Sequence, residues 1–201
     1  MTILERISRP GADGGPADAE LIERSRHEPE AFAAVFDRHA DRVHHYLARR
    51  AGPTEADDLL SATFLTAFEQ RDRFDAARSP AGALPWLMGI ATNLLRGHRR
   101  AEARRWDVLA RARLDPAEPS PAERVAARVD ATVAARPLVD VLTDLPQGDR
   151  DALLLLAWAD LTYEEIAAAL EIPIGTVRSR IHRVRTRLRA AVPSQPNAET
   201  E

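Results

Sequence analysis

The stretch LTYEEIAAALEIPIGTVRSRIHRVRTRLRA, residues 161–190, decides the fold of this chain. It opens with a T-x-x-E capping box, Thr162 to Glu165, which predicts that a helix begins at Tyr163. The segment EIPIG, residues 171–175, then places a proline and a glycine in a tight turn, and a second helix follows. Two helices joined by so short a turn predict a helix-turn-helix, whose second helix enters the major groove of DNA.

The second of these helices has an apolar face and a basic face. On a wheel of 3.6 residues per turn, its aliphatic residues cluster on one side. They are Val177, Ile181, Val184 and Leu188. The opposite side carries Ser179, His182, Arg183 and Thr186, flanked by Arg178, Arg180, Arg185 and Arg187. These groups bond bases or phosphates, and the helix start near Thr176 offers free N–H groups to a phosphate.

The charge on this helix is uncompensated. No acid lies between Glu171 and Glu199, whereas a helix that is merely solvated usually mixes signs for pairing along its surface. The chain as a whole has a net charge of −3, so the basic helix does not reflect a basic protein. We therefore expect this segment to contact nucleic acid.

Composition predicts an all-α chain. Aromatic residues make up only 5% of the 201 residues while hydrophobic residues make up 45%, so the cores must consist mainly of Leu, Val, Ile and Ala. Alanine favours helices over strands. There is no cysteine, so disulfides and thiolate metal sites are excluded. The longest apolar run, residues 152–159, is too short to cross a membrane, and the N-terminus lacks a signal-peptide core, so we expect a cytoplasmic protein.

Two small helical domains joined by a flexible linker are expected, because the proline-rich segment LDPAEPSPA, residues 114–122, has no periodicity. Asp18 is predicted to cap the first helix and Thr54 the third. The expected parts are a disordered leader (1–17), a helical domain (18–113), a linker (114–135), a helix-turn-helix domain (136–192) and a disordered tail (193–201).

The first domain has two charge poles. Residues 54–75 carry six acids against two arginines, and residues 96–113 carry seven arginines against two acids. The basic pole suits a second nucleic-acid contact, and the acidic pole suits a protein partner with a basic surface. Helix capping alone also explains the acids, so for that pole both interpretations stay open. Asn93 is either a buried polar anchor or a base contact.

Nothing in the sequence indicates an enzyme. No Ser/His/Asp set or pair of carboxylates forms a catalytic cluster, and the histidines have no spacing with acids that predicts a metal site. We expect no catalytic residue, no metal and no cofactor.

Residues 145–188 resemble the C-terminal promoter-binding region of bacterial sigma factors, through the pattern L-T-Y-x-E-I-A…L-x-I-P-x-G-T-V-R-S-R-I-H-R. The segments FDRHADRVHHYLARR, DDLLSATFLTAF and PWLMGIATNLLRGHRR are similar to the other sigma domain. With about 200 residues and two domains, the chain resembles the extracytoplasmic-function (ECF) group of the sigma-70 family. This resemblance implies a factor that binds core RNA polymerase through its beta and beta-prime subunits, brings it to promoter DNA and helps to melt it.

The resemblance also implies a role for particular residues. Those expected to read the minus-thirty-five element as duplex are Thr176, Arg178, Ser179, Arg180, His182 and Arg183. Those expected to hold the separated minus-ten strand are Phe74, Asp75, Arg78, Ser79, Asn93, Arg96, Arg99 and Arg100. Those expected on the polymerase-binding surface are Asp57, Asp58, Leu59, Ser61 and Phe64. Ser61-Ala62 stand where many relatives carry Gln-Glu, which removes an acid and an amide from that surface.

The alternative is a stand-alone helix-turn-helix regulator, which needs neither an acidic partner surface nor a strand-capturing loop. An anti-sigma partner is a further expectation from the resemblance, and membrane insertion is not expected.

Overall fold

The computed structural model describes residues 17–77, 79–112, 142 and 144–191, and every regular element among them is a helix. The prediction of an all-α chain is therefore confirmed. The predicted leader (except Ala17), linker and tail lie outside the described residues. None of the described helices combines the length and the apolar character needed to span a lipid bilayer.

The helices form two units, which we call the first unit (residues 17–112) and the second unit (residues 144–191). The first unit contains α1 (Asp18–Arg24), the 3-10 helix η2 (Pro29–Phe32), α2 (Ala33–Ala51), α3 (Pro53–Glu69), the 3-10 helix η3 (Arg71–Arg73) and the long α4 (Leu84–Ala112). The second unit contains α7 (Gln147–Trp158), α8 (Tyr163–Leu170) and α9 (Ile174–Ala191).

In the first unit, α2, α3 and α4 pack against one another around aliphatic side chains. Gly52 joins α2 to α3 with φ of 97°, a backbone conformation that favours glycine, and Pro53 then begins α3. The tyrosine of α2, Tyr46, is fully buried and its hydroxyl bonds that of Thr92 on α4 at 2.9 Å. A buried hydroxyl with a partner costs far less than an unpaired one, so Tyr46 fills the core without a polar penalty.

Two predicted helix caps are wrong. Helix α3 begins at Pro53, so Thr54 lies in its first turn and makes no capping bond. Helix α1 begins at Asp18 itself, and the Asp18 carboxylate points inward rather than along α1. It accepts hydrogen bonds from the His39 ring at 2.8 Å and from the Ala83 N–H at 2.8 Å, and it pairs with Arg38. Asp18 thus ties α1 to α2 and to the start of α4.

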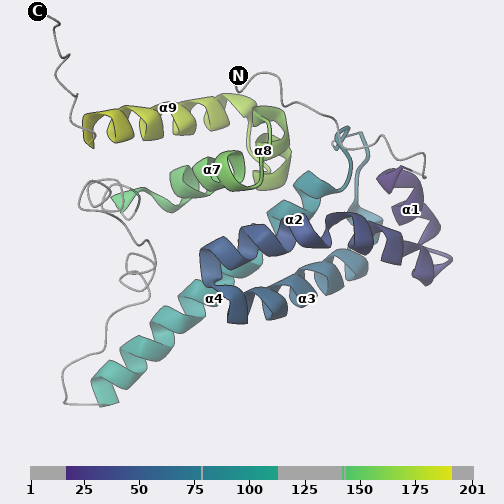
Figure 1. Ribbon diagram of the computed structural model, residues 1–201, viewed down its shortest axis with the longest axis horizontal. Coiled ribbons are helices and arrows are strands. Elements are labelled where there is room, and N and C mark those ends of the chain that lie inside the picture. The colour runs from purple at the N-terminus through teal and green to yellow at the C-terminus, as the bar shows by residue number, and fades with distance from the viewer. Residues whose placement is uncertain (1–16, 78, 113–141, 143, 192–201) are drawn as a thin grey trace, which may run out of the picture.

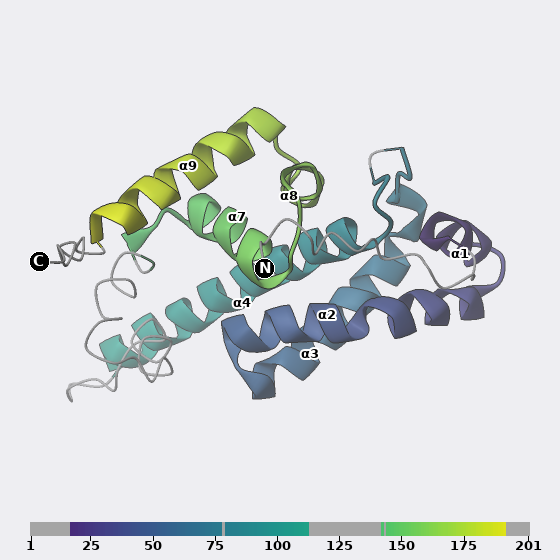
Figure 2. The same cartoon turned by 45° about the horizontal axis from the view of Figure 1, so that its top comes forward.

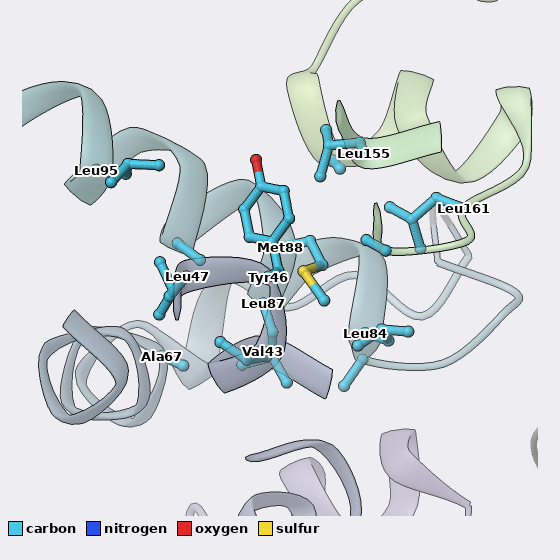
Figure 3. Close-up of a cluster of buried hydrophobic side chains, with 14 of the residues drawn as sticks. Val43, Tyr46, Leu47, Ala67, Leu84, Leu87, Met88, Leu95, Leu155 and Leu161 are labelled. Atoms are coloured by element: carbon cyan, nitrogen blue, oxygen red, sulfur yellow. The ribbon is translucent and has the colours of Figure 1, made fainter. Parts of the chain in front are cut away.

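The second unit lies directly against the first. In Figures 1 and 2, α7 and α8 lie next to α2 and α4, while α9 lies on the outer side of the second unit and α3 on the far side of the first. Figure 3 shows Leu155 and Leu161 of the second unit facing Tyr46 and Met88 of the first, and all four are buried in one continuous cluster. The apolar core therefore crosses the boundary between the units.

Candidate nucleic-acid interface

The helix-turn-helix is formed by α8, the turn 171–173 and α9. The predicted capping box is present: Thr162 Oγ1 accepts from the Glu165 N–H at 3.2 Å, and the Glu165 carboxylate accepts from the Thr162 N–H at 2.7 Å. Glu171 ends α8 in the left-handed conformation, with φ of 53°. This conformation turns the chain sharply, so that only two residues separate Glu171 from the start of α9 at Ile174.

Helix α9 has the two faces that its sequence predicts. Val177, Ile181 and Val184 are buried against the rest of the second unit. Arg178, Ser179 and His182 are exposed, and Thr176 is half-buried at the helix start. The exposed side faces away from the first unit in both views (Figures 1 and 2), so the packing of the two units leaves it accessible.

Two of the predicted reading arginines are held by α7. The Asp149 carboxylate, which is buried, accepts hydrogen bonds from Arg183 Nε at 3.1 Å and from Arg183 Nη2 at 2.8 Å. These bonds raise the pKa of Arg183, whose side chain stays 56% exposed. Arg180 Nε lies 3.9 Å from the same carboxylate and Arg180 Nη1 donates to the Gly148 carbonyl at 3.4 Å. Sequence reasoning missed Asp149 because the pairing joins residues 34 positions apart.

The residues predicted to hold the minus-ten strand fall in two places. The loop before α4 contains Phe74, whose ring lies 5.2 Å from that of Trp86, and Asp75, whose carboxylate accepts from the Ala77 N–H at 2.9 Å. Ser79 is half-buried in a turn that ends at Gly82. Arg78 lies outside the described residues.

The remaining minus-ten residues lie on α4. Asn93 and Arg100 are exposed. Asn93 is therefore not a buried anchor, and its role as a base contact stays a prediction. Arg99 instead lies against α2, where its Nη2 donates to the Arg50 carbonyl at 2.6 Å. Burial and the neighbouring charges of Arg50 and Arg150 lower the pKa of Arg99 to about 10.

Arg96 is bound by the second unit. Its Nε donates to Oδ2 of Asp151 on α7 at 2.7 Å, and the other oxygen of that carboxylate lies 2.7 Å from Arg50 Nη2. Asp151 is fully buried and the Arg50 side chain is only 2% exposed. We call these three residues the Asp151 latch. An ion pair so thoroughly removed from water requires both partners, since removing one leaves an uncompensated buried charge.

Close backbone packing accompanies the latch. A Cβ added to Gly89 on α4 would overlap the carbonyl oxygen of Ala169 on α8, so only glycine lets these helices approach so closely. Arg42 Nη2 on α2 donates to the Ala159 carbonyl at 2.9 Å, and the guanidinium of Arg49 lies 6.0 Å from the Trp158 ring. The contact between the units therefore combines apolar, ionic and backbone contacts.

The predicted polymerase-binding residues on α3 divide into exposed and buried ones. Asp57, Asp58 and Ser61 are exposed, and His44 Nε2 lies 3.0 Å from Asp57 Oδ1. Leu59 and Phe64 are buried, so the expectation that they lie on the surface is wrong. They belong to the core because their positions on α3 face α2 and α4.

Two exposed apolar residues near these acids were missed by the sequence analysis. Leu65 on α3 is 59% exposed, and Phe36 on α2 is 40% exposed with its ring 4.7 Å from that of Phe64. Large apolar side chains left in water next to acids are typical of a surface that binds another protein. The apolar spacing of α3 alone could not have identified Leu65, because the apolar residues of α3 include two adjacent pairs, Leu59-Leu60 and Phe64-Leu65.

Comparison with known proteins identifies both units. The family model described as Sigma-70 region 2 matches residues 35–105, and that described as Sigma-70, region 4 matches residues 135–188. The chain is 36% identical over 168 residues to RNA polymerase sigma factor CarQ of Myxococcus xanthus, covering 80% of this chain and 88% of CarQ. It is 36% identical over 159 residues to ECF RNA polymerase sigma factor SigE of Mycolicibacterium smegmatis, covering 75% of this chain and 57% of SigE.

A solved structure shares the fold. It is the sigma factor RpoE of Bartonella quintana, crystallised with the anti-sigma factor NepR, with a TM-score of 0.56 and 20% sequence identity. The match covers 83% of this chain and 99% of the RpoE chain.

Proposed function

This chain belongs to the sigma-70 family, in its extracytoplasmic-function group, and from that premise we propose which of its surfaces performs each step of promoter recognition. As a sigma factor it binds core RNA polymerase, directs it to specific promoters and assists DNA melting. The observation that carries the assignment of surfaces is the exposed, acid-free outer face of α9, which lies away from the first unit.

The outer face of α9 reads the minus-thirty-five element as duplex. Arg178, Ser179 and His182 are exposed there, and Arg183 is oriented by Asp149. Arginine forks bond guanine edges in the major groove, whereas hydroxyl and imidazole groups bond bases or phosphates. The N–H groups at the start of α9, near Thr176, fix the helix on the phosphate backbone.

The loop 74–82 and the outer face of α4 hold the separated minus-ten strand. Phe74 supplies an aromatic ring from the loop. Asn93 and Arg100 supply exposed polar groups from α4, the helix that follows the loop. Single strands are bound by stacking on rings and by cations that follow the backbone. Arg96 joins this surface only after it leaves Asp151 of the second unit, and Arg99 only after it leaves the Arg50 carbonyl on α2.

The exposed side of α3 binds the polymerase. Asp57, Asp58 and Ser61 provide its polar part, and Leu65 with Phe36 provides its apolar part. This surface lies on the far side of the first unit from α9 (Figure 1), so polymerase and duplex approach from different sides.

Promoter binding requires the two units to separate. The minus-ten and minus-thirty-five elements are about 25 base pairs apart, which corresponds to roughly 85 Å along B-form DNA. In this structure Arg96 of the first unit and Asp151 of the second are 2.7 Å apart, so the closed arrangement cannot occupy both elements. We infer that the closed arrangement is the resting form of the free factor and that polymerase binding opens it.

An anti-sigma protein is the second partner that we propose, because RpoE, which has the same fold, was crystallised with one. The chain acts by binding rather than by catalysis, and its place of action is the cytoplasm, where polymerase and promoters are found.

The test is run-off transcription with purified core polymerase and a candidate promoter. Transcript that depends on this chain supports the proposal. A stand-alone helix-turn-helix regulator would instead bind promoter DNA tightly without polymerase and yield no transcript with it.

A further inference from the structure

A pocket lined by arginines lies where the two units meet. It has a volume of about 260 Å³ and opens between α2, α4 and α7. Its cationic residues are Arg50, Arg96, Arg99, Arg100 and Arg150, and Ala103 and Gln147 complete the wall. Both units contribute, so the complete pocket exists only in the closed arrangement.

The lining of this pocket carries five arginines and no acid. Of the acids around it, Asp151 is shared by Arg50 and Arg96, and the charge of Asp144 acts on Arg150, whose guanidinium also donates to the Leu142 and Leu145 carbonyls. Arg99 donates to a backbone carbonyl, and the Nε of Arg50, which is buried, has no hydrogen-bond partner among the described residues. Burial and the charge of Arg50 lower the pKa of both Arg99 and Arg150.

Cations crowded together in a half-enclosed site are destabilising unless an anion joins them. Guanidinium groups match phosphate oxygens in geometry and bond them in pairs. A pocket of this volume accommodates a small anion with one or two phosphate groups, and Gln147 and Arg150 of α7 form part of its wall.

We propose that this pocket binds a small polyphosphate anion, which bridges the two units and stabilises the closed form of the factor. The proposal rests on the assignment of the closed arrangement as the resting form. Because Arg96, Arg99 and Arg100 belong both to the pocket and to the minus-ten surface, a bound anion opposes engagement of the promoter strand.

The test uses the full chain and inorganic pyrophosphate in magnesium-free buffer, with binding measured by calorimetry at constant ionic strength. Gln147→Glu adds an acid to the wall from the second unit and Ala103→Glu adds one from the first. Gln147→Ala and Ala103→Gln are the matched neutral controls. Each acid should weaken pyrophosphate binding about tenfold or more through like-charge repulsion, and each neutral change should alter it by less than about threefold.

A second measurement follows the bridging. The chain has no cysteine, so labels placed by Glu69→Cys on α3 and Ala190→Cys on α9 report the distance between the units. In the labelled chain that keeps Gln147, pyrophosphate should narrow the distribution of that distance. In the labelled chain that also carries Gln147→Glu, pyrophosphate should leave the distribution unchanged.

Three results would overturn the proposal. The first is that the acidic and the neutral variants bind pyrophosphate equally well, which would indicate that pyrophosphate only screens the charges of the protein. The second is weakening by Ala103→Glu alone, because α4 would then bind the anion without α7. The third is that Gln147→Glu weakens binding of a minus-ten single strand as much as it weakens pyrophosphate, since a backbone phosphate would then be the occupant. These measurements need no polymerase, so their failure leaves the run-off result unaffected.

Discussion

Asp149 on α7 holds the guanidinium of Arg183 on α9 by two hydrogen bonds, 3.1 Å to Nε and 2.8 Å to Nη2. Such side-on pairing leaves an N–H on each terminal nitrogen of Arg183, which is the pair that forks onto guanine. Because Asp149 is buried and fixed within α7, it restricts the rotation of Arg183 before DNA arrives. Less side-chain entropy is then lost on binding.

Arg183→Ala should therefore relax base preference at one position of the minus-thirty-five element by about 1–3 kcal/mol. Competition binding of holoenzyme to promoters with each base at each position measures this. Arg185→Ala, on the flank of the same helix, is the control and should weaken all sequences alike. Asp149→Asn should reduce the same preference to a smaller extent. An equal loss on every sequence for Arg183→Ala would make that residue a phosphate contact.

Asp58→Arg and Leu65→Ser should each weaken binding to core polymerase about tenfold or more, because one reverses charge and the other removes exposed apolar area. Affinity is measured by fluorescence titration of labelled factor with core enzyme. Glu69→Arg reverses a charge at the far end of the same helix and should have little effect. If the Glu69 variant weakens binding as much as Asp58→Arg, overall charge rather than this surface determines affinity.

Asp151→Asn should open the closed arrangement. The variant removes the charge that Arg50 and Arg96 share, and breaking a buried pair of this kind costs about 3–5 kcal/mol where the groups cannot reach water. Separation of the units lets Arg50 and Arg96 reach water, which avoids this cost. Labels at positions 69 and 190 should therefore report a longer distance. Asp160→Asn is the control, because Asp160 is exposed at φ of 51°, which asparagine tolerates. An unchanged distance with Asp151→Asn would show that the latch does not hold the units together.

Gly89→Ala should open the same boundary without changing any charge. The added methyl group overlaps the Ala169 carbonyl oxygen, and overpacking of this kind costs about 1–3 kcal/mol. Gly97→Ala, on the same helix with nothing near its added Cβ, should instead stabilise α4 by up to about 1 kcal/mol. Denaturant unfolding and the label distance together separate the two effects; a Gly89 variant as stable and as closed as the parent would contradict the close packing of α4 on α8.

Stability should fall in acid through Asp18. Burial alone would raise the pKa of its carboxyl, but hydrogen bonds from His39 and the Ala83 N–H, with the charge of His39 and the bond from Arg38, lower it from 3.8 to about 2. The folded state therefore gains about 2 kcal/mol above pH 4, and this gain is lost as the pH falls from about 4 to 2. Urea unfolding across that range measures the slope. Asp18→Asn should be less stable at neutral pH and should lack this part of the slope.

Local patterns in the sequence predicted the local structure well. The capping box of Thr162 and Glu165, the turn before Ile174 and the two faces of α9 all depend on neighbouring residues, whose spacing is visible in the chain. The all-α class was likewise predicted from the sequence alone, through its composition.

Long-range pairs could not be predicted in this way. Asp18 was expected to cap its own helix, but its partners lie 20 or more positions away, and nothing local distinguishes an inward carboxylate from a capping one. The buried pair of Arg50 and Asp151 joins two units across the undescribed segment. Leu59 and Phe64 were assigned to the surface by resemblance, yet the contacts of α3 with α2 and α4 decide which of its apolar residues are covered.

Two arginines from different helices share the one carboxyl group of Asp151. With the closed arrangement as the proposed resting form, a change at that one position alters how readily the factor opens, while the helices proposed to read DNA keep their own sequences. The threshold for activation is therefore adjustable separately from the choice of target promoters.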